Sequence, residues 1–430
     1  MMNQDKEILT RSSILPKQSI PLANVYLLAV AILLPVARPY LPGNSILLDW
    51  VNVIFLPILW LQIFQEKRTL RFPLFWPMFL LFGVALLPLF NHSYSSVKLS
   101  LTFLFKEMYL YLWFLTMVNI IGKKLPKHLL TVFVLSATVI AIVVIVQWAS
   151  PQFLKATTSW PQEVQRGVFL GGSHRPLSLF RNPAMMGNYL ALSIFLLVGS
   201  PVWRRKILRW IVAGCLVVGV VASGAFGAIM MLIAWASIVC WLHRRYLLAP
   251  AILVRLVVGV IVIGGVIFVL RGNFLQTEAS VLFSQRYTMQ SIEISYNTRI
   301  DIWRSAIESF IANPLGVGVG LFFDKEYGLF RYIHNDCLAM LIERGVLGGI
   351  GMIWLLISIL RLIPPSDIHR VNSPSISKLY RATLIGALVA MLVGSLSINI
   401  FRFRQLWFLL FLLVQANESF KPLTNRKSVR

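Results

Sequence analysis

Apolar runs long enough to cross a membrane recur along the whole chain, and short polar connections separate most of them. A helix of about 20 apolar residues spans the roughly 30 Å hydrocarbon layer of a bilayer. The predicted helices cover residues 22–37, 44–64, 73–90, 100–121, 129–149, 182–200, 207–222, 224–242, 249–270, 336–360, 382–398 and 405–416. The pattern therefore predicts an all-α fold, a polytopic transmembrane helical bundle of about 12 spans.

The composition agrees with a membrane protein. Hydrophobic residues make up 57% of the chain and charged residues only 13%, whereas about a quarter of a soluble domain is charged. No cleavage pattern follows the first apolar run, so we expect that helix to remain as an anchor. The three cysteines show neither a paired framework nor zinc-ligand spacing, which argues against structural disulfides and structural zinc.

The basic residues of the connections predict the orientation of the helices. Connections on one side of the predicted bundle, together with both termini, hold 23 Lys and Arg residues, and those on the other side hold 14. Because short cytoplasmic loops are enriched in Lys and Arg, both termini are expected in the cytoplasm. Much of the formal net charge of +24 is then explained by the orientation of the helices, and most of these basic residues are expected to contact anionic lipid headgroups. Nothing else in the sequence supports nucleic-acid binding.

Two connections, 150–181 and 271–335, are far longer than the others and should face outward. They divide the chain into 1–270, with nine helices and the outer loop 150–181; 271–335, a large periplasmic loop carrying an interfacial helix; and 336–430, with three helices and a cytoplasmic tail.

The first long connection ends in a cationic motif, "GGSHRPLSLFRNPAMMGNYLAL" (171–192). Arg175 and Arg181 precede Asn182 and Pro183, which suit the N-cap and the first turn of a helix. Free N–H groups at a helix N-terminus bind anions, and two arginines strengthen that interpretation. The alternative is an interfacial loop anchored by arginines.

The second long connection contains an amphipathic segment, predicted as a surface helix over 299–311 with Thr298 as its N-cap. Arg286 and Arg299 are candidate anion contacts, and simple interfacial snorkelling is the alternative. The glycines of "GVGVG" (316–320) predict a tight backbone path; without a preceding strand they do not indicate a nucleotide loop.

His334 lies directly before the predicted helix 336–360, with Asn335 or Asp336 as its cap. A lone histidine is usually structural, but this one sits at a helix N-terminus behind a long outer loop. Histidine titrates near neutral pH and suits general-base work.

Several charges fall inside predicted spans, where they are costly and need partners or a wet cavity. Lys106 and Glu107 are adjacent and point different ways, so each needs its own partner. Glu343, beside Arg344, is expected to brace the bundle rather than to act at the site. Arg255 is expected to snorkel to the cytoplasmic side.

Arginines and helix N-termini on one face suit a phosphate or diphosphate, because guanidinium binds phosphate oxygens in a bidentate manner. The outer loops show no carboxylate cluster with metal-ligand spacing and nothing like a serine triad, so neither a metal nor a cofactor is predicted. A diphosphate site with one base suggests transfer from a lipid-linked diphosphate donor.

Three motifs together resemble the O-antigen ligase and O-antigen polymerase family of bacterial membrane glycosyltransferases. They are "RPLSLFRNPAMMGNYLAL", "RIDIWRSAIESFIANPLGVGVG" and "HNDCLAMLIERGVLGG", and they occur in the order found in that family. Each motif alone is weak, but the ordered set over residues 175–349 is fairly specific.

The resemblance implies a metal-independent enzyme of the glycosyltransferase C superfamily in the bacterial inner membrane, and attack of the acceptor opposite the leaving group would make it inverting. It would move a glycan from undecaprenyl diphosphate to lipid A-core or a lipid-linked glycan at the periplasmic face. His334 matches the essential histidine, and Arg175, Arg286 and Arg299 match the outer arginines. The turn Ser223-Gly224 departs from the pattern because it lacks an arginine, which Arg402 or Arg404 could replace.

Ligase and polymerase share these motifs, so both interpretations stay open. A lipid-linked oligosaccharide flippase is an alternative from another class, and a subunit of a polysaccharide export machine is a third. A flippase needs charges along a path open to both leaflets, whereas the candidate residues gather on one face. A structural subunit would not require His334.

The predicted topology can be tested by labelling. A cysteine placed at Gln276 should react with a membrane-impermeant thiol reagent while the inner membrane is intact, because 271–335 is predicted to lie outside. Reaction only after that membrane is permeabilised would contradict the orientation.

Overall fold

The computed structural model describes residues 21–36, 46–91, 93–121, 125–126, 128–149, 178–180, 182–200, 206–242, 289–324, 329–330, 332–363, 375–396 and 398–420. The α-helices are Pro21–Leu33 (α1), Leu47–Gln65 (α2), Phe75–Val84 (α3), Tyr94–Ile120 (α4), Leu129–Ala149 (α5), Pro183–Gly199 (α8), Lys206–Ala222 (α9), Phe226–Leu242 (α10), Met289–Ala312 (α14), Asp336–Arg361 (α15), Ser375–Ser395 (α16) and Arg404–Phe420 (α17). Two 3₁₀ turns, Leu87–Asn91 (η2) and Ile400–Arg402 (η4), and two short antiparallel strands, Phe323–Asp324 (β1) and Leu329–Phe330 (β2), complete these elements.

The all-α membrane fold is confirmed for the described residues. Four helices, α2, α4, α5 and α15, are long and apolar enough to cross a membrane, and six shorter apolar helices accompany them. The predicted helix 249–270, with Arg255, lies outside the described residues, so the count of twelve spans stays a prediction. Helix α4 begins at Tyr94 and α16 at Ser375, six and seven residues before their predicted starts.

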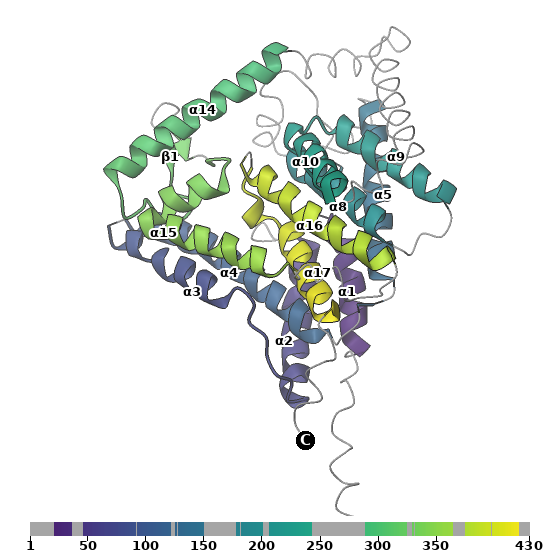
Figure 1. Ribbon diagram of the computed structural model, residues 1–430. Coiled ribbons are helices and arrows are strands. Elements are labelled where there is room, and N and C mark those ends of the chain that lie inside the picture. The colour runs from purple at the N-terminus through teal and green to yellow at the C-terminus, as the bar shows by residue number, and fades with distance from the viewer. Residues whose placement is uncertain are drawn as a thin grey trace, which may run out of the picture.

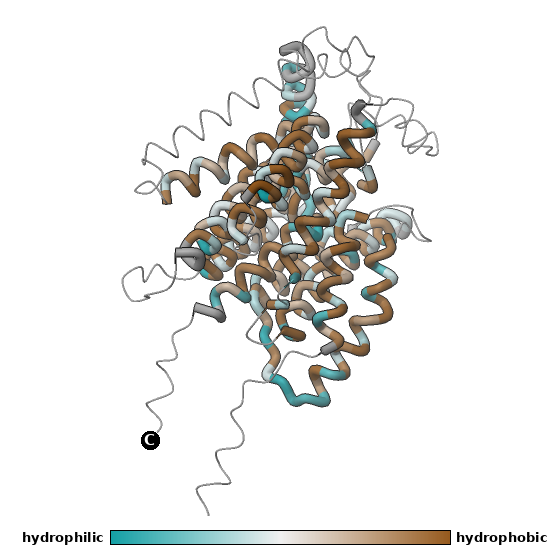
Figure 2. Tube along the Cα trace, turned by 90° about the vertical axis from the view of Figure 1, so that its right-hand side faces the viewer, coloured by the Kyte–Doolittle hydropathy of each residue, from teal (hydrophilic) through white to brown (hydrophobic). Residues whose placement is uncertain are grey.

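The helices form a bundle with α14 lying across one end of it, above α15 and close to β1 (Figure 1). Most of the helical tube is hydrophobic, with hydrophilic stretches mainly near helix ends (Figure 2). The C-terminal end of α4 meets the connection between α2 and α3, where the Arg71 amide donates to the Asn119 side chain at 2.8 Å. The predicted outer and cytoplasmic connections therefore contact opposite ends of α4.

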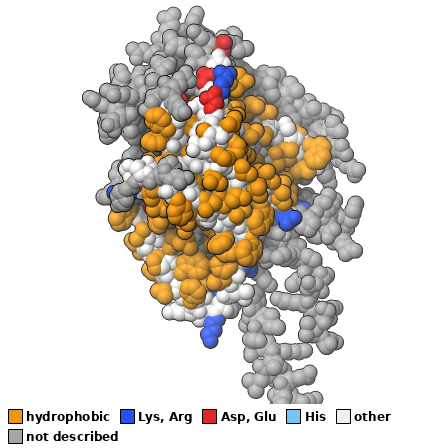
Figure 3. All heavy atoms as spheres, turned by 90° about the vertical axis from the view of Figure 1, so that its left-hand side faces the viewer, with side chains coloured by type: hydrophobic (Ala, Val, Ile, Leu, Met, Phe, Trp, Pro, Cys, Tyr) orange, Lys and Arg blue, Asp and Glu red, His pale blue; other side chains and the backbone are white. Residues whose placement is uncertain are grey.

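The side of the bundle on the left of Figure 1 presents a broad hydrophobic surface, with charged side chains at its upper edge (Figure 3). Large apolar side chains on α2, α3 and α15 are exposed there or on neighbouring faces, among them Val53, Trp76, Phe79 and Ile353. Such exposure is expected where lipid tails, rather than water, cover the helix.

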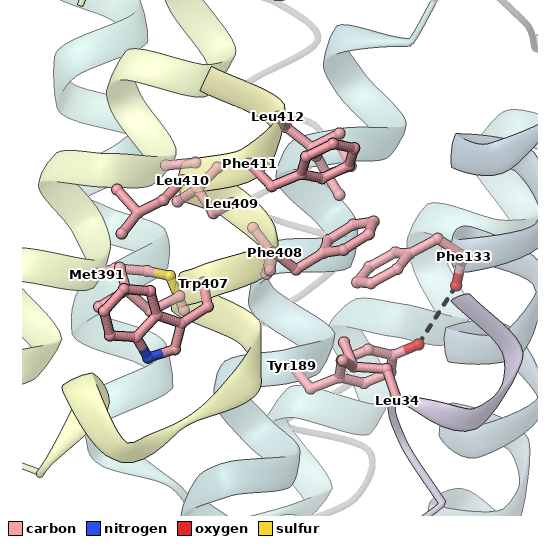
Figure 4. Close-up of a cluster of buried hydrophobic side chains, with 14 of the residues drawn as sticks. Leu34, Phe133, Tyr189, Met391, Trp407, Phe408, Leu409, Leu410, Phe411 and Leu412 are labelled. Atoms are coloured by element: carbon pink, nitrogen blue, oxygen red, sulfur yellow. Dashed lines mark hydrogen bonds between the residues drawn. The ribbon is translucent and has the colours of Figure 1, made fainter. Parts of the chain in front are cut away.

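Two helices, α8 and α17, are buried on nearly all sides and form the centre of the bundle. Phe408 of α17 stacks on Phe133 of α5 with ring centroids 4.9 Å apart, and the Tyr189 hydroxyl of α8 donates to the Phe133 carbonyl at 3.4 Å (Figure 4). Elsewhere α8 and α10 approach closely through a small residue, because a Cβ on Gly187 of α8 would lie 3.0 Å from the Cβ of Ala228 in α10. Small residues at such crossings let membrane helices pack by direct contact.

The amphipathic helix α14 is longer than predicted. It begins at Met289 rather than after Thr298, so Thr298 lies in its interior and the predicted N-cap is wrong. No Gly or Pro interrupts residues 289–298, so nothing in that stretch stops the helix earlier. Its predicted end is confirmed, because α14 finishes at Ala312 before Asn313-Pro314.

Helix α15 is broken at Gly345, whose φ of 67° and ψ of −164° are not helical. The loop after α14 fills the break. The amides of Val317 and Gly318 donate to the carbonyls of Ile342 and Glu343, each at 3.0 Å, and the Val346 amide donates to the Pro314 carbonyl at 3.1 Å. Non-helical backbone at membrane depth persists only where protein satisfies its polar groups, and this loop supplies those partners.

The glycines at this junction leave no room for side chains. A Cβ on Gly345 would lie 2.3 Å from the Pro314 carbonyl oxygen, and one on Gly316 would lie 2.7 Å from the Glu343 carbonyl oxygen. All three glycines of "GVGVG" have positive φ. The predicted tight backbone path is therefore confirmed. The glycine that packs against this path is Gly345, which belongs to the third motif, "HNDCLAMLIERGVLGG".

We expect Gly345→Ala to lower the free energy of unfolding by about 2 kcal/mol or more, because it combines a left-handed backbone with a steric clash. Gly214→Ala is the matched control, since a Cβ there meets nothing within 4 Å. It should be neutral or stabilising by up to about 1 kcal/mol. Thermal unfolding of both purified variants in detergent measures the difference; equal midpoints would contradict this account.

Candidate functional site

His334 lies between the β1–β2 hairpin and α15, in a backbone conformation that is uncommon for its residue type. Its φ is +56°, in the left-handed region, which costs a non-glycine residue of order 1 kcal/mol or more. Ile333 before it is buried, whereas Tyr332 is 49% exposed and His334 is half-buried. Strained backbone of this kind clusters at functional sites, so the conformation supports a role for this histidine.

The residues after His334 hold the start of α15. The Asn335 side chain caps the helix by accepting from the Leu338 amide at 3.0 Å, so Asn335, and not Asp336, is the N-cap. The buried carboxylate of Asp336 instead accepts from the amides of Ile400 and Phe401, at 2.7 and 3.2 Å. The histidine segment is thereby attached to η4, between α16 and α17.

Helix α14 reaches the same segment from the other side. The Trp303 indole N–H donates to the Ile333 carbonyl at 3.0 Å, one residue before His334. Arg299 is half-buried and lies four residues before Trp303, on the same face of α14. This spacing puts Arg299 on the same helix face as Trp303, which contacts the histidine segment.

A network of four buried charges lies behind this segment. Glu107 of α4 pairs with Arg344 of α15 and with the Nε of Arg402, the latter at 2.9 Å. Arg402 of η4 also reaches Glu343 of α15 at 2.6 Å, and the second oxygen of Glu343 accepts from the Gly320 amide at 3.1 Å. The network joins α4, α15, η4 and the glycine loop, and its two positive and two negative groups cancel.

The remaining predicted site residues have different outcomes. Asn182 caps α8 as predicted, because its side chain accepts from the Ala184 amide at 2.7 Å and Pro183 opens the helix. Arg175, Arg181 and Arg286 lie outside the described residues, so their roles stay predictions. Glu343 makes the bracing contacts expected of it.

Sequence reasoning missed Arg402 and Asp336 as links between distant helices. Glu107 and Arg344 stood out as intramembrane charges, but 237 residues separate them and no local spacing reveals such a pair. The candidate substitutes for an arginine at the Ser223-Gly224 turn both pair with carboxylates: Arg402 with Glu107 and Glu343, and Arg404 with Asp49.

Residues 210–353 match the family model described as O-antigen ligase. This part of the chain is therefore similar to the O-antigen ligase family. This ligase-family segment begins in α9 and ends within α15, and it includes Arg286, Arg299 and His334. The motif of Arg175 and Arg181 precedes it. A search of curated proteins found no match.

The charge network generates a stability prediction. Glu107→Gln should lower the free energy of unfolding by about 3 kcal/mol, because removing one partner of a buried ion pair leaves the charge of Arg344 uncompensated, whereas Arg402 keeps Glu343. Glu66→Gln is the control, since the Glu66 side chain is 40% exposed and its partner Arg68, at 2.6 Å, also donates to the Ile120 carbonyl at 3.3 Å. Loss of a pair with an exposed carboxylate costs about 0–1 kcal/mol. Chemical unfolding in detergent should separate the two variants, and equal stabilities would show that the network contributes little.

Proposed function

We propose that this protein is a glycosyltransferase of the O-antigen ligase type in the bacterial inner membrane. It moves a glycan from undecaprenyl diphosphate to an acceptor hydroxyl, on lipid A-core or on another lipid-linked glycan, at the periplasmic face. The observation that carries the proposal is the placement of His334, strained and half-buried at the N-terminus of α15 within a ligase-family segment.

In the proposed reaction, His334 accepts the proton of the acceptor hydroxyl. The hydroxyl oxygen forms a bond to the anomeric carbon from the face opposite the diphosphate, and the bond from that carbon to the phosphate oxygen breaks. The configuration at the anomeric carbon is therefore inverted. The electron pair leaves with the diphosphate, whose charge is stabilised by Arg299 and by the positive end of α15. The other arginines assigned to the diphosphate are Arg175, Arg181 and Arg286. The mechanism requires no metal, because cationic side chains stabilise the leaving group.

A repeat-unit polymerase is the second candidate, since the same chemistry would serve an acceptor that is itself a lipid-linked repeat unit. Product size distinguishes them: one discrete addition indicates a ligase and a ladder of repeat units a polymerase. A flippase is less well supported. The charges behind His334 are paired with one another, and no open row of charges along the bundle is seen among the described residues.

His334→Ala should lower glycan transfer by roughly 10²–10⁴-fold while donor binding is nearly unchanged, because it removes general-base help. The assay uses purified protein, radiolabelled lipid-linked glycan and EDTA, since no metal is required. Transfer at the wild-type rate by a folded His334→Ala variant would refute the mechanism. Loss of wild-type transfer in EDTA, restored by magnesium or manganese, would refute metal independence.

Arg299→Ala provides the comparison within that assay. It should weaken both donor binding and turnover, because the guanidinium contacts the diphosphate charge in the ground state and in the transition state. Arg304→Ala is its control, since Arg304 is an exposed arginine on the same helix. It should behave as wild type.

A further inference from the structure

Lys106 is an unmatched cation within a membrane-spanning helix. It is exposed and lies twelve residues from the start of α4, or about 18 Å along the axis at 1.5 Å per residue. The neighbouring carboxylate of Glu107 is taken by Arg344 and Arg402. Within the described part of the chain, no carboxylate lies in ion-pair distance of Lys106. An ionisable group at this depth indicates a functional site unless a partner accounts for it.

The Lys106 side chain lies beside an aromatic ring of the preceding turn. Its ammonium group lies 5.5 Å from the centroid of the Phe103 ring, one turn nearer the helix start. That ring is seated on the glycine loop, because a Cβ on Gly320 would lie 2.4 Å from it. The ring that Lys106 contacts is therefore packed on the loop that closes the break in α15.

Phe103 connects Lys106 to the histidine segment. Tyr332, two residues before His334, meets the Phe103 ring edge-on with centroids 6.4 Å apart. On the same ring, the Arg402 guanidinium carbon lies 5.8 Å from the centroid. The Nη1 of Arg402 has no hydrogen-bond partner among the described residues. Aromatic rings and two cations thus adjoin the segment that carries the proposed base.

Snorkelling to lipid headgroups explains Lys106 poorly. Lysines that snorkel are found near helix ends, where the stem reaches the interface. Lys98, two turns nearer the start of α4 and also exposed, occupies that position. Lys106 is about 12 Å deeper along the axis and is engaged by an aromatic ring beside the site.

We propose that Lys106 binds an anionic group, a phosphate, carried by the acceptor glycolipid. Phe103 and Tyr332 pack against the adjoining sugar. This subsite holds the acceptor on the α4 side of His334, while Arg299 approaches from α14 with the donor. The inference rests on the proposed function, because it assigns one of the two substrates of that reaction.

The test compares Lys106→Gln with the matched control Lys98→Gln in full-length protein reconstituted in phosphatidylcholine nanodiscs. Microscale thermophoresis measures binding of phosphorylated lipid A-core and of the same glycolipid after phosphatase treatment. Lys106→Gln should weaken binding of the phosphorylated form about tenfold and leave the dephosphorylated form unchanged. Lys98→Gln should match wild type, and Lys106→Arg should retain most of the affinity.

Transfer kinetics give the second measurement. Lys106→Gln should raise the KM for the phosphorylated acceptor about tenfold, with kcat and the KM for the donor nearly unchanged. Unchanged acceptor binding in a folded Lys106→Gln variant, or an equal loss in Lys98→Gln, would overturn the subsite. A wild-type protein that binds the phosphorylated acceptor through Lys106 but transfers no glycan would instead refute the proposed function alone.

Discussion

The structure around the site depends on one requirement: backbone polar groups buried away from water must find partners. Helix α15 breaks at Gly345, where the chain is buried, and its freed carbonyls would be costly if left without partners. The loop after α14 satisfies them with two amides. Because α14 continues directly into that loop, its position is tied to α15, and the segment carrying His334 lies between the two helices.

The network of four buried charges favours one arrangement of the helices at this junction. A buried ion pair is weak evidence for stability, because desolvation offsets much of the attraction. Here the ion pairs determine geometry, because they form together in one arrangement of α4, α15 and η4. The paired residues are Glu107, Arg344, Arg402 and Glu343. Asp336 adds a second tie between α15 and η4. The histidine segment is therefore held by elements from both ends of the sequence.

Much of this could be predicted from sequence, and the failures have physical causes. Apolar runs predicted eleven of the described α-helices, and the amphipathic pattern predicted α14. Asn182 was recognised as a cap, and Asn335 was one of two candidates, because capping is a local effect. Thr298 failed because a good cap residue does not end a helix that can continue through it. Arg402 and Asp336 were missed because their partners lie far away in sequence. The sequence shows glycines in both motifs, but it does not show that Gly316 and Gly345 pack against each other's segments.

Because the glycine loop and the break in α15 fit each other, the two segments have to be exchanged together when chimeras of related proteins are made. Gly316 and Gly345 each occupy space against backbone of the other segment, so neither segment fits a partner shaped differently. A chimera that replaces only the loop, or only the helix, joins surfaces that were not selected together. A chimera intended to change substrate specificity should therefore exchange residues 289–363 as one block. The recipient protein should keep residues equivalent to Glu107 and Arg402, which pair with that block.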